Sequence, residues 1–238
     1  MAKTLSVGFL WHMHQPLYKD LLTGKYHLPW VRLHSTYSYL DMVSVLRDFP
    51  GIKCTFNLTP SLIWQLRDIS GNESIDDVYL KLSAKPAEEL TDEDRVFILK
   101  NFFSCDRATA IDPFKRYREI LEKRGDDLSR DTLLEKSGLF SQDEYRDLQV
   151  LFNLAWCGFT LRNEDQLVKN LVSKGAFFSE EDKTLLLKKQ HEVVCSILPL
   201  YKKMQDEGRI EISTTPYYHP IMPILCGRGR KDLRSEEH

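Results

Sequence analysis

The stretch from Leu5 to Pro16 alternates in a way that constrains the fold more than any other part of the chain. Its odd-numbered residues from Leu5 to Met13 are large and apolar, whereas its even-numbered residues from Ser6 to His14 begin small and end in two histidines, His12 and His14. Side chains of an extended segment point alternately to opposite sides, and proline ends a strand. The pattern therefore predicts a first barrel strand that packs helices on its outer side and brings two imidazoles to its carboxyl end.

Two later stretches alternate in the same manner. Residues 52–58 and 208–215 each carry apolar side chains on one parity and polar ones on the other. Apolar residues at helical spacing in 34–49 separate the first two strands, which gives a strand, a helix and a strand in about fifty residues. Such units form parallel sheets with helices on the outside. The fold class expected from the residues is therefore α/β with three parallel strands.

The region between the second and third strands is expected to be helical. We predict a helical insertion over about residues 71–163, followed by a long helix that starts at Ser179 and ends before Gly208. Trp156 and Phe159 are expected to be core residues, with sugar stacking as the open alternative. Residues 227–238 are polar and are predicted to form a mobile tail after a domain that covers residues 1–226.

Composition excludes several classes of partner. The 238 residues include 33 basic and 35 acidic side chains, and a formal net charge of −2 creates no field that favours nucleic acid or an anionic membrane. Five widely spaced cysteines without a CxxC pair indicate reduced thiols. No apolar run approaches the roughly 18 residues of a membrane span, so we expect a cytoplasmic protein.

Two motifs resemble those of a known enzyme family. His14-Gln15-Pro16 follows an apolar strand, and the block from Gly208 to Pro223 contains the aromatic pair Tyr217-Tyr218 before His219 and Pro220. Together they resemble glycoside hydrolase family 57, most closely its α-amylase and amylopullulanase-like members. The resemblance implies a (β/α)7-type barrel, of which this chain would be the N-terminal, incomplete part. It also implies retaining hydrolysis of α-glucans such as maltooligosaccharides, with no cofactor and no metal.

Parallel strands would bring the polar residues of these motifs to one rim, where barrel enzymes build their sites. In the family, the nucleophilic glutamate and the acid/base aspartate lie on later strands, and neither motif occurs here. We therefore expect no catalytic residue within this chain, which would end before its carboxylates and be inactive alone. Glu211 lies near the start of its strand, which favours a structural role over substrate contact. The candidate substrate-binding residues are His12, His14, Gln15, Asn57, Glu211, Thr215, Tyr218 and His219.

Two other functions remain open on the sequence. A His-x-His at a strand end can also seat a divalent metal, with His219 as a third ligand, which would make the chain a metal-dependent hydrolase. The chain could instead be a non-catalytic carbohydrate-binding remnant. Three strands leave two sheet edges open, which predicts possible self-association through those edges.

Overall fold

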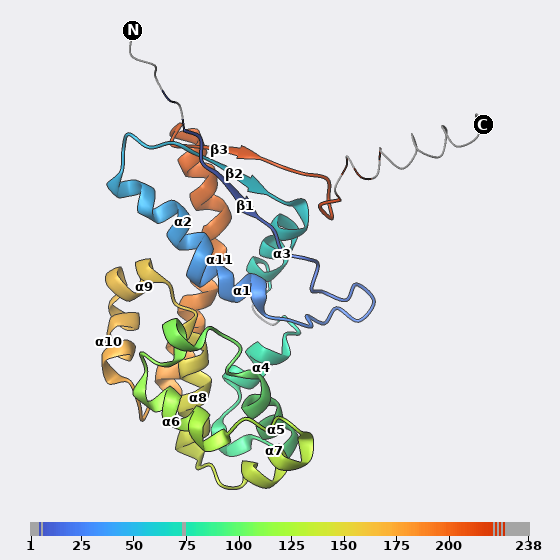
Figure 1. The fold of residues 1–238 in the computed structure, drawn as a ribbon, viewed down its shortest axis with the longest axis vertical. Helices are drawn as coiled ribbons and strands as arrows, with labels where there is room; N and C mark the ends of the chain where they lie inside the picture. The colour runs from blue at the N-terminus through green and yellow to red at the C-terminus, as the bar shows by residue number, and fades with distance from the viewer. Residues whose placement is uncertain are drawn as a thin grey trace, which may run out of the picture.

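A small parallel sheet forms one end of the molecule (Figure 1). The computed structural model describes residues 5, 7–72, 75–220, 222, 224 and 226, so the predicted tail at 227–238 lies outside the described residues. The sheet contains β1 (Leu10–Met13), β2 (Cys54–Leu58) and β3 (Ile210–Ser213). β1 pairs with β2 and β2 with β3, both in parallel, which confirms the prediction of three parallel strands.

Helices account for most of the remaining described residues. A consecutive helical run follows β1: α1 (Trp30–His34), a π-helical turn (Ser35–Tyr39), α2 (Leu40–Ser44) and a 3-10 turn (Val45–Asp48). Short turns at Ala87–Glu89 and Arg107–Ile111 interrupt the region between β2 and β3. The other helices are α3 (Pro60–Ser70), α4 (Val78–Ala84), α5 (Asp92–Asn101), α6 (Lys115–Arg124), α7 (Arg130–Ser137), α8 (Gln142–Ala155), α9 (Phe159–Glu164), α10 (Gln166–Lys174) and α11 (Glu180–Asp206).

Local sequence explains where the principal helices begin. α5, α8 and α11 each start with a capping box, in which the side chain of the capping residue and that of the third helical residue bond each other's backbone N–H groups. The capping residues are Thr91, Ser141 and Ser179. α11 ends two residues before Gly208, whose φ of 67° suits glycine. The helical region continues past residue 163 through α9 and α10.

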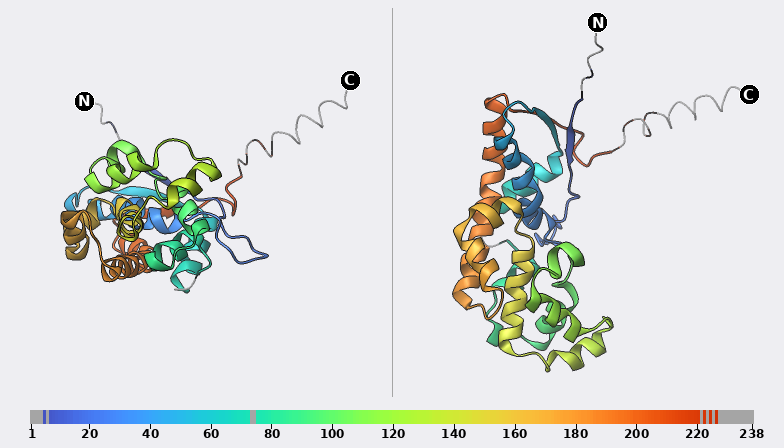
Figure 2. Two further views of the ribbon diagram at one scale, coloured as in Figure 1. Left: turned by 90° about the horizontal axis from the view of Figure 1, so that it is seen from below. Right: turned by 60° about the vertical axis from the view of Figure 1, so that its left-hand side comes forward.

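One face of the sheet packs against helices, and the other face has no described helix over it. Figure 2 shows α2, α3 and α11 on the same side of the sheet. Phe56 of β2 is fully buried there and meets Tyr201 of α11 edge to face at 5.2 Å. The Tyr201 hydroxyl donates to the Tyr39 carbonyl at 2.9 Å, which joins α11 to the π-helical turn. The helix-covered face thus matches the apolar parity of the strands.

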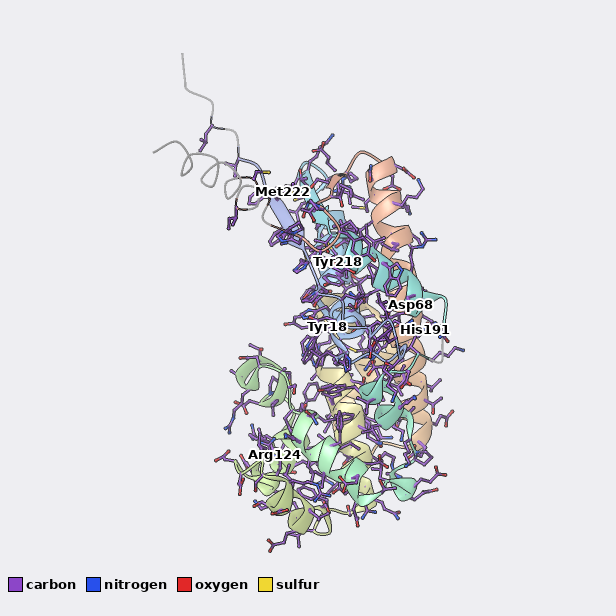
Figure 3. All side chains as sticks on the ribbon, turned by 90° about the vertical axis from the view of Figure 1, so that its right-hand side faces the viewer. Tyr18, Asp68, Arg124, His191, Tyr218 and Met222 are labelled. Atoms are coloured by element: carbon purple, nitrogen blue, oxygen red, sulfur yellow. The ribbon has the colours of Figure 1, made fainter. Side chains whose placement is uncertain are left out.

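The molecule is elongated, and buried polar groups hold its two ends together. Tyr218 lies near the sheet, whereas Arg124 lies toward the opposite end (Figure 3). Between them, the Asn153 carboxamide of α8 accepts from Arg32 Nη1 at 3.0 Å and donates to Ser83 Oγ at 2.8 Å. Arg32 belongs to α1, so the helical region and the sheet-bearing part share one core. No helix in the described ranges has the length and apolar character to cross a membrane.

A carboxylate from α2 caps α9 across a gap of more than a hundred positions in the chain. Asp41 accepts from the Phe159 N–H at 2.6 Å and from the Thr160 N–H at 2.8 Å. A Cβ on Gly158 would lie 2.3 Å from the Asp41 carboxylate and 2.7 Å from the Tyr37 carbonyl. Glycine is required here because no side chain fits beneath the cap.

We expect Gly158→Ala to lower the free energy of unfolding by about 2 kcal/mol, since backbone and carboxylate must move to admit the methyl group. Urea unfolding followed by circular dichroism measures this loss. Gly138→Ala is the matched control, because a Cβ there meets nothing within 4 Å. Equal stability of the two variants would show that the Asp41 cap tolerates displacement.

Candidate functional site

Three imidazoles converge where β1 ends. His12 is on β1, His14 is the first residue after the end of β1, and His219 lies in the loop after β3. Their ring centroids are 5.9 Å apart for His12 and His14, 4.5 Å for His12 and His219, and 5.0 Å for His14 and His219. The parallel register brings these residues together from sequence positions more than two hundred apart. We call this group the histidine rim.

A hydrogen-bonded row runs across the sheet beneath the histidine rim. His12, Asn57 and Ser213 are register partners on the three strands. His12 Nδ1 lies 2.8 Å from Asn57 Oδ1, and Asn57 Nδ2 donates to Ser213 Oγ at 3.1 Å. Because the carboxamide oxygen can only accept, Nδ1 of His12 donates this bond, which leaves Nε2 outside it. Asn57 therefore orients His12 and is largely buried in doing so.

Gln15 is clamped by two tyrosines. Its Nε2 donates to the Tyr39 hydroxyl at 3.0 Å, and its Oε1 accepts from the Tyr18 hydroxyl at 2.7 Å. Ser61 Oγ donates to the Gln15 carbonyl at 3.0 Å. Burial raises the pKa of Tyr39, so its hydroxyl keeps its proton. The oxygen and the nitrogen of the Gln15 side-chain amide are therefore both hydrogen-bonded to tyrosines. These bonds, with that of Ser61 to the Gln15 carbonyl, fix the backbone after His14.

The remaining candidates lie at different heights on the sheet. Glu211 is exposed, pairs in register with Thr55 two positions below the Asn57 row, and accepts from Thr55 Oγ1 at 3.4 Å. Glu211 thus lies two residues nearer to the start of its strand than Ser213, the β3 member of that row. Tyr218 is 63% exposed and meets Tyr217 edge to face at 4.8 Å. Thr215 Oγ1 is buried without a hydrogen-bond partner among the described residues.

The backbone of His219 adopts an uncommon conformation. Its φ is 55°, in the left-handed region, and its N–H donates to the Pro216 carbonyl at 2.9 Å. A residue with a Cβ pays roughly 1 kcal/mol or more to occupy this region. The tight turn that imposes this conformation also turns the imidazole toward His12 and His14.

The surroundings of His14 oppose its protonation. Desolvation lowers the pKa of His14, and the nearby charges of protonated His219 and His12 lower it further. A lowered folded-state pKa means that the unfolded chain takes up the proton first. This contribution to stability is present above the unfolded pKa of about 6.5 and is lost as pH falls through the folded pKa.

We therefore expect His14→Gln to lose less stability than the parent when pH falls from about 7.5 to about 5, the range in which the His14 contribution disappears. The urea midpoint at each pH measures the loss, and the difference between parent and variant removes contributions from other groups. Parallel profiles for the two proteins would contradict the expectation.

The histidine rim presents hydrogen-bonding ring nitrogens at the end of the sheet. Neutral imidazoles and phenols bond hydroxyl groups without the desolvation penalty of a charge. Within the described ranges, no group of three or more His, Cys, Asp or Glu is arranged to hold a metal ion. On the three described strands, Glu211 carries the only carboxylate. The arrangement suits recognition of a polyhydroxylated ligand.

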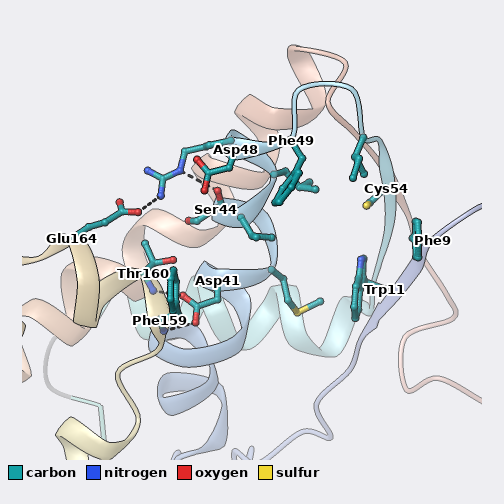
Figure 4. Close-up of a pocket in the computed structure, with 15 residues that line it drawn as sticks. Phe9, Trp11, Asp41, Ser44, Asp48, Phe49, Cys54, Phe159, Thr160 and Glu164 are labelled. Atoms are coloured by element: carbon teal, nitrogen blue, oxygen red, sulfur yellow. Dashed lines mark hydrogen bonds and ion pairs between the residues drawn. The ribbon is translucent and has the colours of Figure 1, made fainter.

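A groove of about 500 Å³ opens on the opposite side of β1 (Figure 4). Phe9 and Trp11 line it and remain 51% and 47% exposed, whereas Met13 is 1% exposed. The apolar residues of this strand were predicted to pack against helices. Met13 is buried as predicted, whereas Phe9 and Trp11 are not. Phe159 also lines the groove and is 73% exposed, so its assignment to the core was wrong. Trp156 is half-buried and packs 5.6 Å from Trp30.

Comparison with known proteins identifies one family. The family model described as glycosyl hydrolase family 57 matches residues 8–237. No curated protein and no solved structure matches the chain significantly. The match includes the three strands, the helical region between them and the histidine rim.

Proposed function

Because the chain belongs to glycosyl hydrolase family 57, we propose that its histidine rim binds α-glucans such as maltooligosaccharides. Membership of this family makes the chain a glycoside hydrolase. We propose, in addition, that its specificity is of the α-amylase or amylopullulanase type. The observation that carries the proposal is the meeting of His12, His14 and His219 within 4.5–5.9 Å of one another. Rows of neutral donors and acceptors are what sugar hydroxyls require.

The candidate residues have different roles in this proposal. His14, His219 and Tyr218 contact sugar directly, with Thr215 Oγ1 available as a further donor. His12 contacts sugar through Nε2 while Asn57 holds its ring. Gln15 acts through the backbone that it fixes, and Glu211, two residues before Ser213 on β3, stays a candidate substrate contact.

We also propose that the sheet is part of a (β/α)7-type barrel. Three features support this: the strands are parallel, helices cover one face, and the polar parity faces the uncovered side. β1 and β3 are the outer strands of the described sheet, so self-association through their free edges belongs to the same proposal. Size-exclusion chromatography with light scattering tests it, and a monomer at all concentrations would contradict it.

The experiment that tests glucan binding is calorimetric titration of the purified chain with maltohexaose. Cellohexaose, which has the same composition and β-linkages, is the matched control ligand. Saturable binding of maltohexaose alone is the expected result. Equal binding of both sugars, or of neither, would contradict specificity for α-glucans.

We predict that this chain binds without hydrolysing. Retaining hydrolysis requires two carboxyl groups about 5–5.5 Å apart, and on the described strands Glu211 has no acidic companion. The assay is reducing-sugar release from starch and pullulan, with Glu211→Gln as the control variant. Turnover that Glu211→Gln abolishes would show that Glu211 belongs to a catalytic pair.

A further inference from the structure

Hydrogen bonds hold the backbone on both sides of His14. The Met13 carbonyl accepts from the Thr59 N–H at 3.2 Å, and the Gln15 carbonyl accepts from Ser61 Oγ at 3.0 Å. Thr59 and Ser61 lie where β2 passes into α3, and both are fully buried. The start of α3 therefore fixes the level at which His14 leaves the sheet.

A second pair of bonds holds the chain beyond Gln15. Gln65 of α3 is fully buried, its Nε2 donates to the Pro16 carbonyl at 2.9 Å, and its Oε1 accepts from the Tyr18 N–H at 2.9 Å. Proline also restricts the backbone of the residue before it. Among the described residues, the hydrogen bond between Gln15 and Tyr39 is the one that joins residues 13–18 to the helical run after β1.

Tyr39 reaches Gln15 from the π-helical turn. Its hydroxyl accepts from Gln15 Nε2 at 3.0 Å, its carbonyl accepts from the Tyr201 hydroxyl at 2.9 Å, and the residue is 4% exposed. The turn closes with a bond from the Leu40 N–H to the Ser35 carbonyl, five residues back, where an α-helix uses four. One inserted residue rotates the rest of a helix by about 100°. The π-helical turn thus sets which side chain of this run faces the loop after β1.

The segment after α8 holds the π-helical turn in place. Thr36, in this turn, is fully buried, and its carbonyl accepts from the Gly158 N–H at 2.9 Å. Thr36 Oγ1 also lies 2.9 Å from the Trp156 carbonyl. A side chain whose own backbone is anchored in this way can hold a neighbour, because it has little freedom to move with it. Tyr39 is therefore a fixed point for Gln15.

We propose that Tyr39 is a positioning residue for the histidine rim. It acts through the Gln15 side-chain amide, which Tyr39 and Tyr18 hold between them. With this amide held, the chain after His14 keeps one conformation, and the His14 imidazole stays beside that of His219. Tyr39 is too buried to contact a ligand itself. The proposal rests on the proposed function only in taking the histidine rim as the glucan site.

The first test compares two tyrosines that each lose one buried hydroxyl. Tyr39→Phe is expected to weaken maltohexaose binding about tenfold, because a binding group that is free to move contributes less. Tyr145→Phe is the matched control, since Tyr145 of α8 is 1% exposed and its hydroxyl donates to the Ser137 carbonyl at 2.9 Å. Both variants should lose similar stability, and only Tyr39→Phe should lose affinity. Equal affinity of the two variants would overturn the proposal.

A double variant shows whether Tyr39 acts through Gln15. The combination of Gln15→Ala with Tyr39→Phe should bind maltohexaose as weakly as Gln15→Ala alone, since the second change then removes nothing further. Calorimetric titration of the parent, the two single variants and the double variant completes the cycle. Additive losses would mean that Tyr39 affects binding by another route, and would refute the assignment.

An NMR titration of the His14 imidazole tests the positioning without sugar. Desolvation, and then the electrostatic effects of His219 and His12, hold the pKa of His14 below its usual value. If Tyr39→Phe frees the imidazole, the pKa of His14 should rise toward about 6.5, and it should stay unchanged in Tyr145→Phe. An unchanged pKa of His14 in Tyr39→Phe would overturn the proposal. A raised pKa in a chain that binds no maltohexaose would support the positioning role and refute the glucan site.

Discussion

Replacing His14 and His219 together by alanine is expected to weaken maltohexaose binding about a hundredfold. In the proposed site each imidazole would supply hydrogen bonds to sugar, and loss of such a bond costs about 1–3 kcal/mol when its partner is left unsatisfied. The two ring centroids are 5.0 Å apart, so one glucan in the proposed site would contact both. Because neither side chain is buried in the core, the free energy of unfolding should change by less than about 1 kcal/mol.

Calorimetric titration and thermal unfolding of the same samples measure both effects. His27→Ala is the control, because His27 is exposed and outside the histidine rim. Binding that survives in the double variant would refute the glucan site. A double variant that unfolds far below the parent would instead show that these histidines stabilise the end of the sheet.

Asp147→Ala is expected to destabilise the protein by about 3–5 kcal/mol, which is the range for removing one partner of a buried ion pair. Asp147 of α8 is fully buried, accepts from Arg116 Nε at 2.8 Å and accepts from the Phe178 N–H at 2.9 Å. Its removal leaves the Arg116 charge and a buried N–H without partners. Denaturant unfolding measures the loss.

Asp143→Ala provides the matched control on the same helix. Asp143 is paired with Arg146 three residues later, and its side chain is 58% exposed. Exposed pairs of this kind contribute about 1 kcal/mol at most. A loss for Asp147→Ala no larger than that of Asp143→Ala would mean that Arg116 and Phe178 find other partners.

Alternation predicted the strands well but not how their faces are covered. Phe56 is buried against Tyr201 as its parity requires. Phe9 also belongs to the apolar set of its strand, yet it is half exposed, because it lines the groove and no described side chain fills the space beside it. Parity determines to which side a residue points, whereas contact depends on where a distant helix lies. The same limit applies to Phe159, whose aromatic sequence context predicted a core position.

The histidine rim was predictable because parallel strands bring their carboxyl ends together. Ser213 shares the parity of Asn57 and could have been included on that signal. The role of Gln15 could not be predicted, since Tyr39 reaches it from a π-helical turn that no sequence pattern announces. The hydrogen bonds of Arg32 were equally hidden, because its partners Asn153 and Gln190 are more than a hundred residues away in sequence.

The connection between β2 and β3 has a consequence for the order of folding. Asn57 and Ser213, bonded across these strands, are 156 residues apart in sequence. Closing so long a loop directly is entropically costly and slow, whereas helices between the strands form through local contacts. Helix formation shortens the effective loop before β3 can dock. We therefore expect helical circular dichroism to recover first on refolding, and the proposed sugar binding, which would use His219, to appear last.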